Sequence, residues 1–103
     1  MKKAILLHEA ADDVGVTTMD LTAGEVVLAV TLEGETVTEI TLAEDVPLSH
    51  KVAMRDMEAQ KHIIEYGRAI GYASTDIVKG AHVHTHNIKS LRWAASAVNL
   101  LEE

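Results

Sequence analysis

Two runs rich in β-branched residues, separated by three residues, constrain the fold of this chain most strongly. Residues 25–32 read EVVLAVTL and residues 36–42 read TVTEITL, and the intervening EGE is typical of a tight turn. Together they predict a β-hairpin. Residues 4–7 (AILL) and 51–54 (KVAM) predict two further short strands.

Turn signals divide the rest of the chain into short pieces. Gly67, Gly71 and Gly80 separate the apolar runs of the second half, which predicts short strands joined by turns. Residues 9–25 predict a long loop with a helical turn. Residues 55–67 predict one or two helical turns, with Asp56 as the cap and Gly67 at the end. No repeat or linker is evident, so the expected fold is mainly β: a compact, convoluted β domain.

The carboxy-terminal segment follows a different period. Apolar side chains at residues 88, 91, 95, 98 and 101 recur at helical spacing, which predicts an amphipathic helix over residues 90–101. Such a helix either packs on its own domain or docks on a partner. We therefore expect a single domain over residues 1–103, with a β core over 1–88 and a terminal helix over 89–103.

Composition excludes several classes of function. The chain has 103 residues, enough for one core, and its net charge of -7 argues against binding to nucleic acid or to an anionic membrane surface. Without cysteine there is no disulfide, thiolate nucleophile or cysteine-ligated metal in this chain. The apolar run after Met1 stops at His8, too short for a signal peptide, so we expect a soluble, cytoplasmic protein.

The segment HVHTHN places His82, His84 and His86 on alternate positions. On a strand all three share one face, with neighbours of that face about 6.5–7 Å apart and the outer two about 13 Å apart. A straight strand therefore favours two metal ligands plus one histidine that either acts on substrate or lies next to the site. Zinc, iron, copper and nickel all suit imidazole. The alternative is a solvated strand face without a function.

A second polar cluster lies in SHKVAMRD, where His50, Lys51 and Arg55 fall within six residues of an otherwise acidic chain. Such cations can orient a substrate that carries a carboxylate. The alternative is a solvated loop whose charges are unrelated.

Taken together, HKVAMRD, EYGRAIGYASTDIVKG and AHVHTHN resemble the amino-terminal SAF domain of the altronate dehydratase family. The matching positions are His50, Lys51, Ala53, Asp56, Tyr66, Gly67, Ile70, Gly71, Ala73, Asp76, Ile77, Gly80, His82, Val83, His84, His86 and Asn87. The chain departs from the family pattern at Ser49, which stands for glycine, at Glu65, which stands for lysine, and in MEAQKH, which replaces a shorter turn. It also lacks the long catalytic region of the family's larger enzymes.

This resemblance implies a β-clip fold and a role as the small subunit of a sugar-acid dehydratase, similar to the small subunit of sulfolactate sulfo-lyase. It also implies a divalent metal, typically iron, and a large catalytic subunit as partner, without which the chain is expected to be inactive. For the roles of residues it implies His84 and His86 in catalysis, and His82, His84 and His86 as metal ligands. Substrate oxygens are assigned to His50, Lys51, Arg55 and Asn87.

Two other functions remain open from the residues alone. One is a free-standing module that binds a sugar acid or a metal ion without catalysis. The other is a purely structural domain that assembles through its terminal helix. A small domain of short strands offers little room for a complete buried active site, so a site shared with another chain is favoured.

Overall fold

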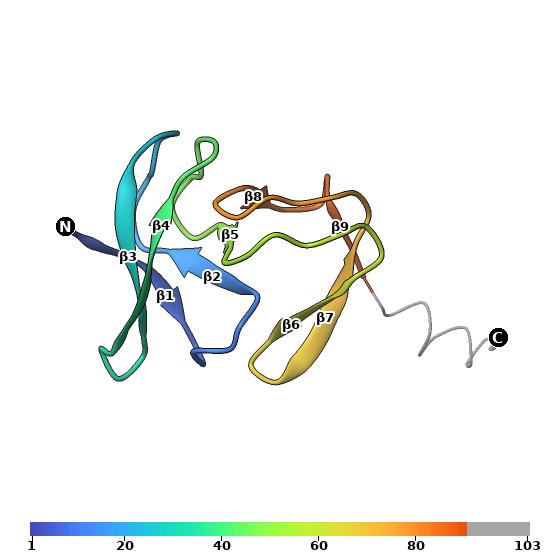
Figure 1. Cartoon of the computed structure of the whole chain (residues 1–103), viewed down its shortest axis with the longest axis horizontal. Coiled ribbons are helices and arrows are strands. Elements are labelled where there is room, and N and C mark those ends of the chain that lie inside the picture. The colour runs from blue at the N-terminus through green and yellow to red at the C-terminus, as the bar shows by residue number, and fades with distance from the viewer. Residues whose placement is uncertain (91–103) are drawn as a thin grey trace, which may run out of the picture.

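A computed structural model describes residues 1–90 of the chain (Figure 1). The helix predicted over residues 90–101 therefore lies outside the described residues, apart from Ser90. The last described strand ends at Lys89, so that residue belongs to the β structure and not to a terminal helix.

Nine β-strands and no helix make up the described residues, which confirms the mainly β class. The strands are β1 (Lys3–Leu7), β2 (Val14–Thr17), β3 (Val26–Thr31), β4 (Thr36–Thr41), β5 (Lys51–Ala53), β6 (His62–Glu65), β7 (Arg68–Ala73), β8 (His82–Val83) and β9 (Ile88–Lys89). Consequently, no helix within residues 1–90 has the length and apolar character needed to cross a membrane.

The strands form two sheets. Six strands follow the order β4-β3-β1-β2-β5-β8, and three follow the order β6-β7-β9. The predicted hairpin is confirmed as β3 and β4, whereas β1 and β3 pair in parallel. Figure 1 shows β1 to β4 in one lobe and β6, β7 and β9 in the other, with β5 and β8 between them.

Each lobe has its own aliphatic core. The larger core includes Ile5, Leu7, Val27, Ile40 and Leu42, all almost fully excluded from solvent. The smaller core is built from Val14, Ala53, Met57, Ile63, Ala73, Ile77, Ala81 and Val83. Strand β5 supplies Val52 to the larger core and Ala53 to the smaller one, so the two lobes share this strand.

Four similar turns organise both lobes. Each begins with an aspartate and an apolar residue, and its fifth position has a positive φ angle. The four turns begin at Asp20, Asp45, Asp56 and Asp76, and their positive-φ residues are Gly24, Ser49, Gln60 and Gly80. Only two of these four positions are glycine, so the sequence gives little sign of the shared left-handed conformation.

The turns pair two by two through their aspartates. Asp20 accepts a hydrogen bond from the backbone N–H of Leu48 (2.8 Å), and Asp45 accepts one from Ala23 (2.9 Å). In the other lobe Asp56 accepts from Lys79 (2.8 Å) and Asp76 from Ala59 (2.9 Å). A backbone bridge joins each pair, Leu21 with Val46 and Met57 with Ile77.

Two local expectations are wrong. Residues 9–25 contain a strand, β2, because Val14 and Gly15 pair with β5 and not with a neighbouring turn of helix. Residues 55–67 are a turn followed by β6, because the Asp56 carboxylate caps Lys79 on a distant turn. In both cases the contacts that decide the conformation are remote in sequence.

Buried carboxylates from the loop between β1 and β2 join the two sheets. Asp12 is 1% exposed and accepts from the N–H of Tyr66 (2.8 Å), while Asp13 is 3% exposed and accepts from the N–H of Ile64 (2.7 Å). Asp13 also binds the Lys61 ammonium at 2.7 Å. These bonds fix the β6–β7 hairpin against the larger sheet.

Candidate functional site

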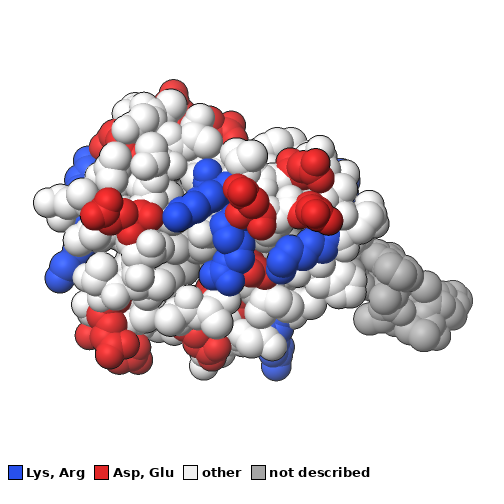
Figure 2. Space-filling view, viewed as in Figure 1, with Lys and Arg blue, Asp and Glu red and all other residues white. Residues whose placement is uncertain are grey.

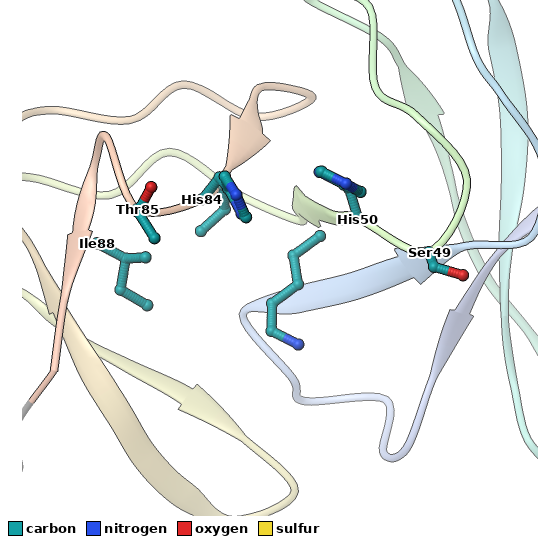
Figure 3. Close-up of a pocket in the computed structure, with 7 residues that line it drawn as sticks. Ser49, His50, His84, Thr85 and Ile88 are labelled. Carbon is teal, nitrogen blue, oxygen red and sulfur yellow. The ribbon is translucent and has the colours of Figure 1, made fainter.

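An open cavity of about 320 Å³ lies where β5, β8 and β9 meet. Its walls are formed by Ser49, His50, Lys51, Val83, His84, Thr85 and Ile88. Figure 3 shows His50 and His84 next to each other, with Thr85 and Ile88 on the side of β9; the Ser49 hydroxyl points away from both histidines. Two segments that the sequence analysis considered separately thus form one site.

The segment HVHTHN is not the straight strand that its alternation predicted. Strand β8 ends at Val83, and residues 84–87 form a tight turn. The side chain of Asn87 closes this turn: its amide nitrogen donates to the carbonyl of His82 (2.8 Å), and its oxygen accepts from the N–H of His84 (2.9 Å). Asn87 is only 5% exposed, so its polar atoms hold the turn.

This turn brings imidazoles together that a straight strand would keep apart. Possible ligand nitrogens of His50, His82 and His84 all lie within 4.8 Å of one another. His50 Nδ1 is 2.8 Å from His82 Nε2, the length of a hydrogen bond in which one ring donates to the other. No carboxylate joins this group among the described residues.

Strand pairing explains how His50 reaches the group. Strands β5 and β8 are antiparallel, with Lys51 opposite Val83 and Val52 opposite His82. Continuing this register by one residue sets His50 against His84, and their ring centroids are 4.9 Å apart. From the sequence alone His50 is a candidate for substrate binding only, because a pairing across some thirty residues leaves no local signal.

His86 occupies a different position. Its ring centroid is 5.5 Å from that of His82, and the residue is exposed at the turn. It is not part of the group of three convergent ligand atoms. The predicted ligand set of His82, His84 and His86 therefore differs from the geometric one by an exchange of His86 for His50.

The predicted cationic cluster divides into two places. Lys51 lines the cavity, and its ammonium lies 3.4 Å from the carboxylate of Glu65 on β6. Arg55 instead donates to the carbonyl of Asp12 (2.8 Å) and pairs with Asp13 (3.5 Å), outside the cavity lining. Figure 2 shows basic side chains gathered near the middle of this face, where the two lobes meet.

Burial of the ring lowers the pKa of His82 below its ordinary value of 6.5, and the neighbouring imidazoles of His50, His86 and His84 lower it further; Glu44 opposes them. The folded state thus favours the neutral ring. A neutral imidazole keeps a free nitrogen lone pair, which is the form that binds a metal ion.

This shift predicts that acid weakens the fold. Because the unfolded chain binds more protons at His82 than the folded chain just below pH 6.5, the contribution of His82 is complete above that pH and is lost as the pH falls through the lower, folded pKa. We expect the urea midpoint to fall between pH 7.5 and pH 5.5, and to fall less in His82→Gln. His62→Gln, a change at an exposed histidine outside this cluster, should keep the wild-type dependence; an unchanged dependence in His82→Gln contradicts the prediction.

Comparison with known proteins gives consistent matches. A model of the altronate/galactarate dehydratase SAF domain matches residues 2–91. The (2R)-sulfolactate sulfo-lyase subunit alpha of Chromohalobacter salexigens is 32% identical over 89 residues, covering 85% of this chain and 95% of that protein. Its namesake from Paracoccus pantotrophus is 43% identical over 54 residues, covering 52% of this chain and 81% of that protein. The altronate dehydratase of Escherichia coli strain K12 is 41% identical over 86 residues, covering 84% of this chain but 16% of that enzyme.

Proposed function

The chain belongs to the altronate/galactarate dehydratase SAF domain family, which confirms the resemblance inferred from its sequence, and on that premise we propose that it is the small subunit of a sugar-acid lyase. In this proposal a large catalytic subunit completes the active site. The observation that carries the proposal is the convergence of His50, His82 and His84 beside an open cavity, which is lined by two of these histidines and by Lys51.

An active site shared between this chain and a second subunit agrees with what the similar proteins are named. Two relatives similar over most of their length are named as alpha subunits, and a name of that kind implies at least one further subunit. In the altronate dehydratase of Escherichia coli, the region similar to this chain forms 16% of the whole enzyme. The cavity here is open and has few walls, so a larger chain can cover it and supply the remaining groups.

The three convergent imidazoles fit a divalent ion, and family resemblance makes iron the first candidate. All-nitrogen ligand sets suit iron and zinc, and three ligands leave positions open for substrate. His50 and His82 would help to hold such an ion through ring nitrogens, which now lie at hydrogen-bond distance from each other and would have to offer free lone pairs. An ion held there supplies Lewis-acid stabilisation of negative charge on substrate oxygens.

The chain's own residues contribute binding and proton transfer. The Lys51 ammonium pairs with the substrate carboxylate at the cavity wall. A base on the large subunit removes the proton from the carbon next to that carboxylate, leaving its electron pair to form the double bond as the carbon–oxygen bond breaks. His86, exposed beside His82, protonates the departing hydroxide to give water.

A second candidate keeps the same site but changes the leaving group. The two matches that cover most of their own length are sulfolactate sulfo-lyase subunits, which favours a 3-sulfo-2-hydroxy acid as substrate and sulfite as product. Sulfite leaves as an anion without needing a proton, so His86 becomes dispensable in this version. Turnover of altronate against sulfolactate, measured after mixing with the large subunit, distinguishes the two.

Metal titration tests the proposal on the chain itself. We expect anaerobic calorimetry with Fe²⁺ to report one ion per chain, and His50→Ala to weaken binding by about 100-fold or more because it removes a ligand. His86→Ala should stay within a few-fold of wild type, as should His62→Ala, the exposed control. Equal losses in His50→Ala and His86→Ala contradict this ligand set, and a wild-type chain that binds no ion contradicts the metal site.

A further inference from the structure

The ion pair between Lys51 and Glu65 has no place in the proposed chemistry, yet it ties the one cation of the cavity lining to the other sheet. Lys51 lies on β5 in the larger sheet, and Glu65 ends β6 in the smaller one. Their charged atoms are 3.4 Å apart. Glu65 itself is absent from the cavity lining, so whatever it does at the site it does through Lys51.

Glu65 is the fixed member of the pair. Its side chain is 12% exposed, whereas that of Lys51 is 37% exposed. Both neighbours of Glu65 in sequence are anchored to buried carboxylates: the N–H of Ile64 donates to Asp13 and the N–H of Tyr66 donates to Asp12. The backbone that carries Glu65 therefore cannot follow the lysine, and the lysine side chain is the part that moves.

The pair is also loosely bonded. A nitrogen–oxygen distance of 3.4 Å exceeds the 2.7–3.2 Å or so of a well-formed N–H···O hydrogen bond. A lysine ammonium has three donors, so a second carboxylate in the cavity can bind it or draw it away. Conversely, a carboxylate that is largely withdrawn from water resists losing its counter-ion. The two carboxylates, one of the protein and one of the ligand, thus compete for one cation.

We infer that Glu65 is a positioning residue that holds the Lys51 ammonium at the cavity wall and competes with the ligand's carboxylate for it. Glu65 thereby weakens the binding of any single carboxylate. It favours ligands with a further anchoring point, such as a 2-hydroxy acid that also reaches the imidazoles. This inference rests on the proposed function, in which Lys51 binds a substrate carboxylate.

Anion titration of the whole chain, loaded with Zn²⁺ as a redox-stable ion, tests the inference. Glycolate serves as the probe because it is the smallest 2-hydroxy acid. We expect Glu65→Gln to bind glycolate about 5–10-fold more tightly than wild type, a gain of the size expected when a competing, partly buried carboxylate loses its charge. Glu33→Gln makes the same change in net charge on an exposed turn, and it should bind as wild type does.

A double-mutant cycle separates this role from a structural one. In the Lys51→Met background Glu65→Gln should produce no further change, because the cation for which the two carboxylates compete is gone. In the assembled enzyme Glu65→Gln should lower KM more than it changes kcat. A structural role lowers the urea midpoint without tightening glycolate binding.

Several results would overturn the inference. They are unchanged or weaker glycolate binding in Glu65→Gln, the same gain in Glu33→Gln, a gain that persists without Lys51, and no glycolate binding by either wild type or Glu65→Gln. If neither protein binds glycolate but the Fe²⁺ titration still reports one ion per chain, the inference fails while the metal site is supported. Failure of the inference and failure of the proposed function are therefore distinguishable.

Discussion

Replacing Asp13 with alanine is expected to lower the free energy of unfolding by about 2–4 kcal/mol, because the change removes a buried carboxylate whose bonds join the two sheets. The Asp13 carboxylate accepts from Lys61 Nζ and from the N–H of Ile64, both at 2.7 Å, and it pairs with Arg55 at 3.5 Å. Without it the N–H of Ile64 loses its acceptor. The two cations are partly exposed and can turn to water, which keeps the cost below that of a fully buried pair.

Urea unfolding at pH 7.5, followed by circular dichroism, measures this effect. Asp13→Asn keeps an oxygen for the N–H of Ile64 but removes the charge, so about half of the loss is expected. Glu33→Ala, on the exposed turn between β3 and β4, should change the stability by less than about 0.5 kcal/mol. An Asp13→Ala protein as stable as the Glu33→Ala control shows that this carboxylate does not join the sheets.

In the assembled enzyme, His84→Ala is expected to lower turnover by about 10²–10⁴-fold, the range for loss of a group that stabilises or transfers charge in the transition state. His84 follows β8 at the cavity wall and faces His50. His86→Ala should lower dehydration by a comparable factor if His86 protonates hydroxide. It should leave sulfite elimination nearly unchanged.

Steady-state kinetics after mixing the chain with its large subunit measures both variants. Co-elution of variant and partner must be retained, so that a loss of activity reports chemistry and not assembly. His62→Ala, on β6 and exposed, is the matched control and should keep wild-type turnover. Normal turnover in both His84→Ala and His86→Ala removes the catalytic role assigned to HVHTHN.

Where the determining contacts were local, the sequence predicted the structure well. The β3–β4 hairpin follows from two β-branched runs and a short turn, and its register needs no distant residue. Residues 55–67 show the opposite case. Asp56 resembles a helix cap, but its carboxylate caps a turn more than twenty residues away, and β6 is held by β7 and by Asp13.

The candidate site shows the same contrast between features that the sequence predicts and features that depend on the folded structure. The sequence identifies HVHTHN and Lys51 as candidates, because histidine spacing and family motifs can be read from the order of the residues. The sequence does not predict the turn at residues 84–87, because this turn depends on hydrogen bonds between the Asn87 amide and the nearby backbone. Nothing local distinguishes that use of an asparagine from a contact with substrate.

The sequence by itself determined the mainly β class, the family and the candidate residues for a site. It determined them because side-chain type and spacing carry that information. Only the tertiary structure decided that possible ligand nitrogens of His50, His82 and His84 converge, and that Lys51 pairs with Glu65 while Arg55 pairs with Asp13. The physical reason is strand pairing: an antiparallel register between β5 and β8 brings residue 50 to residue 84.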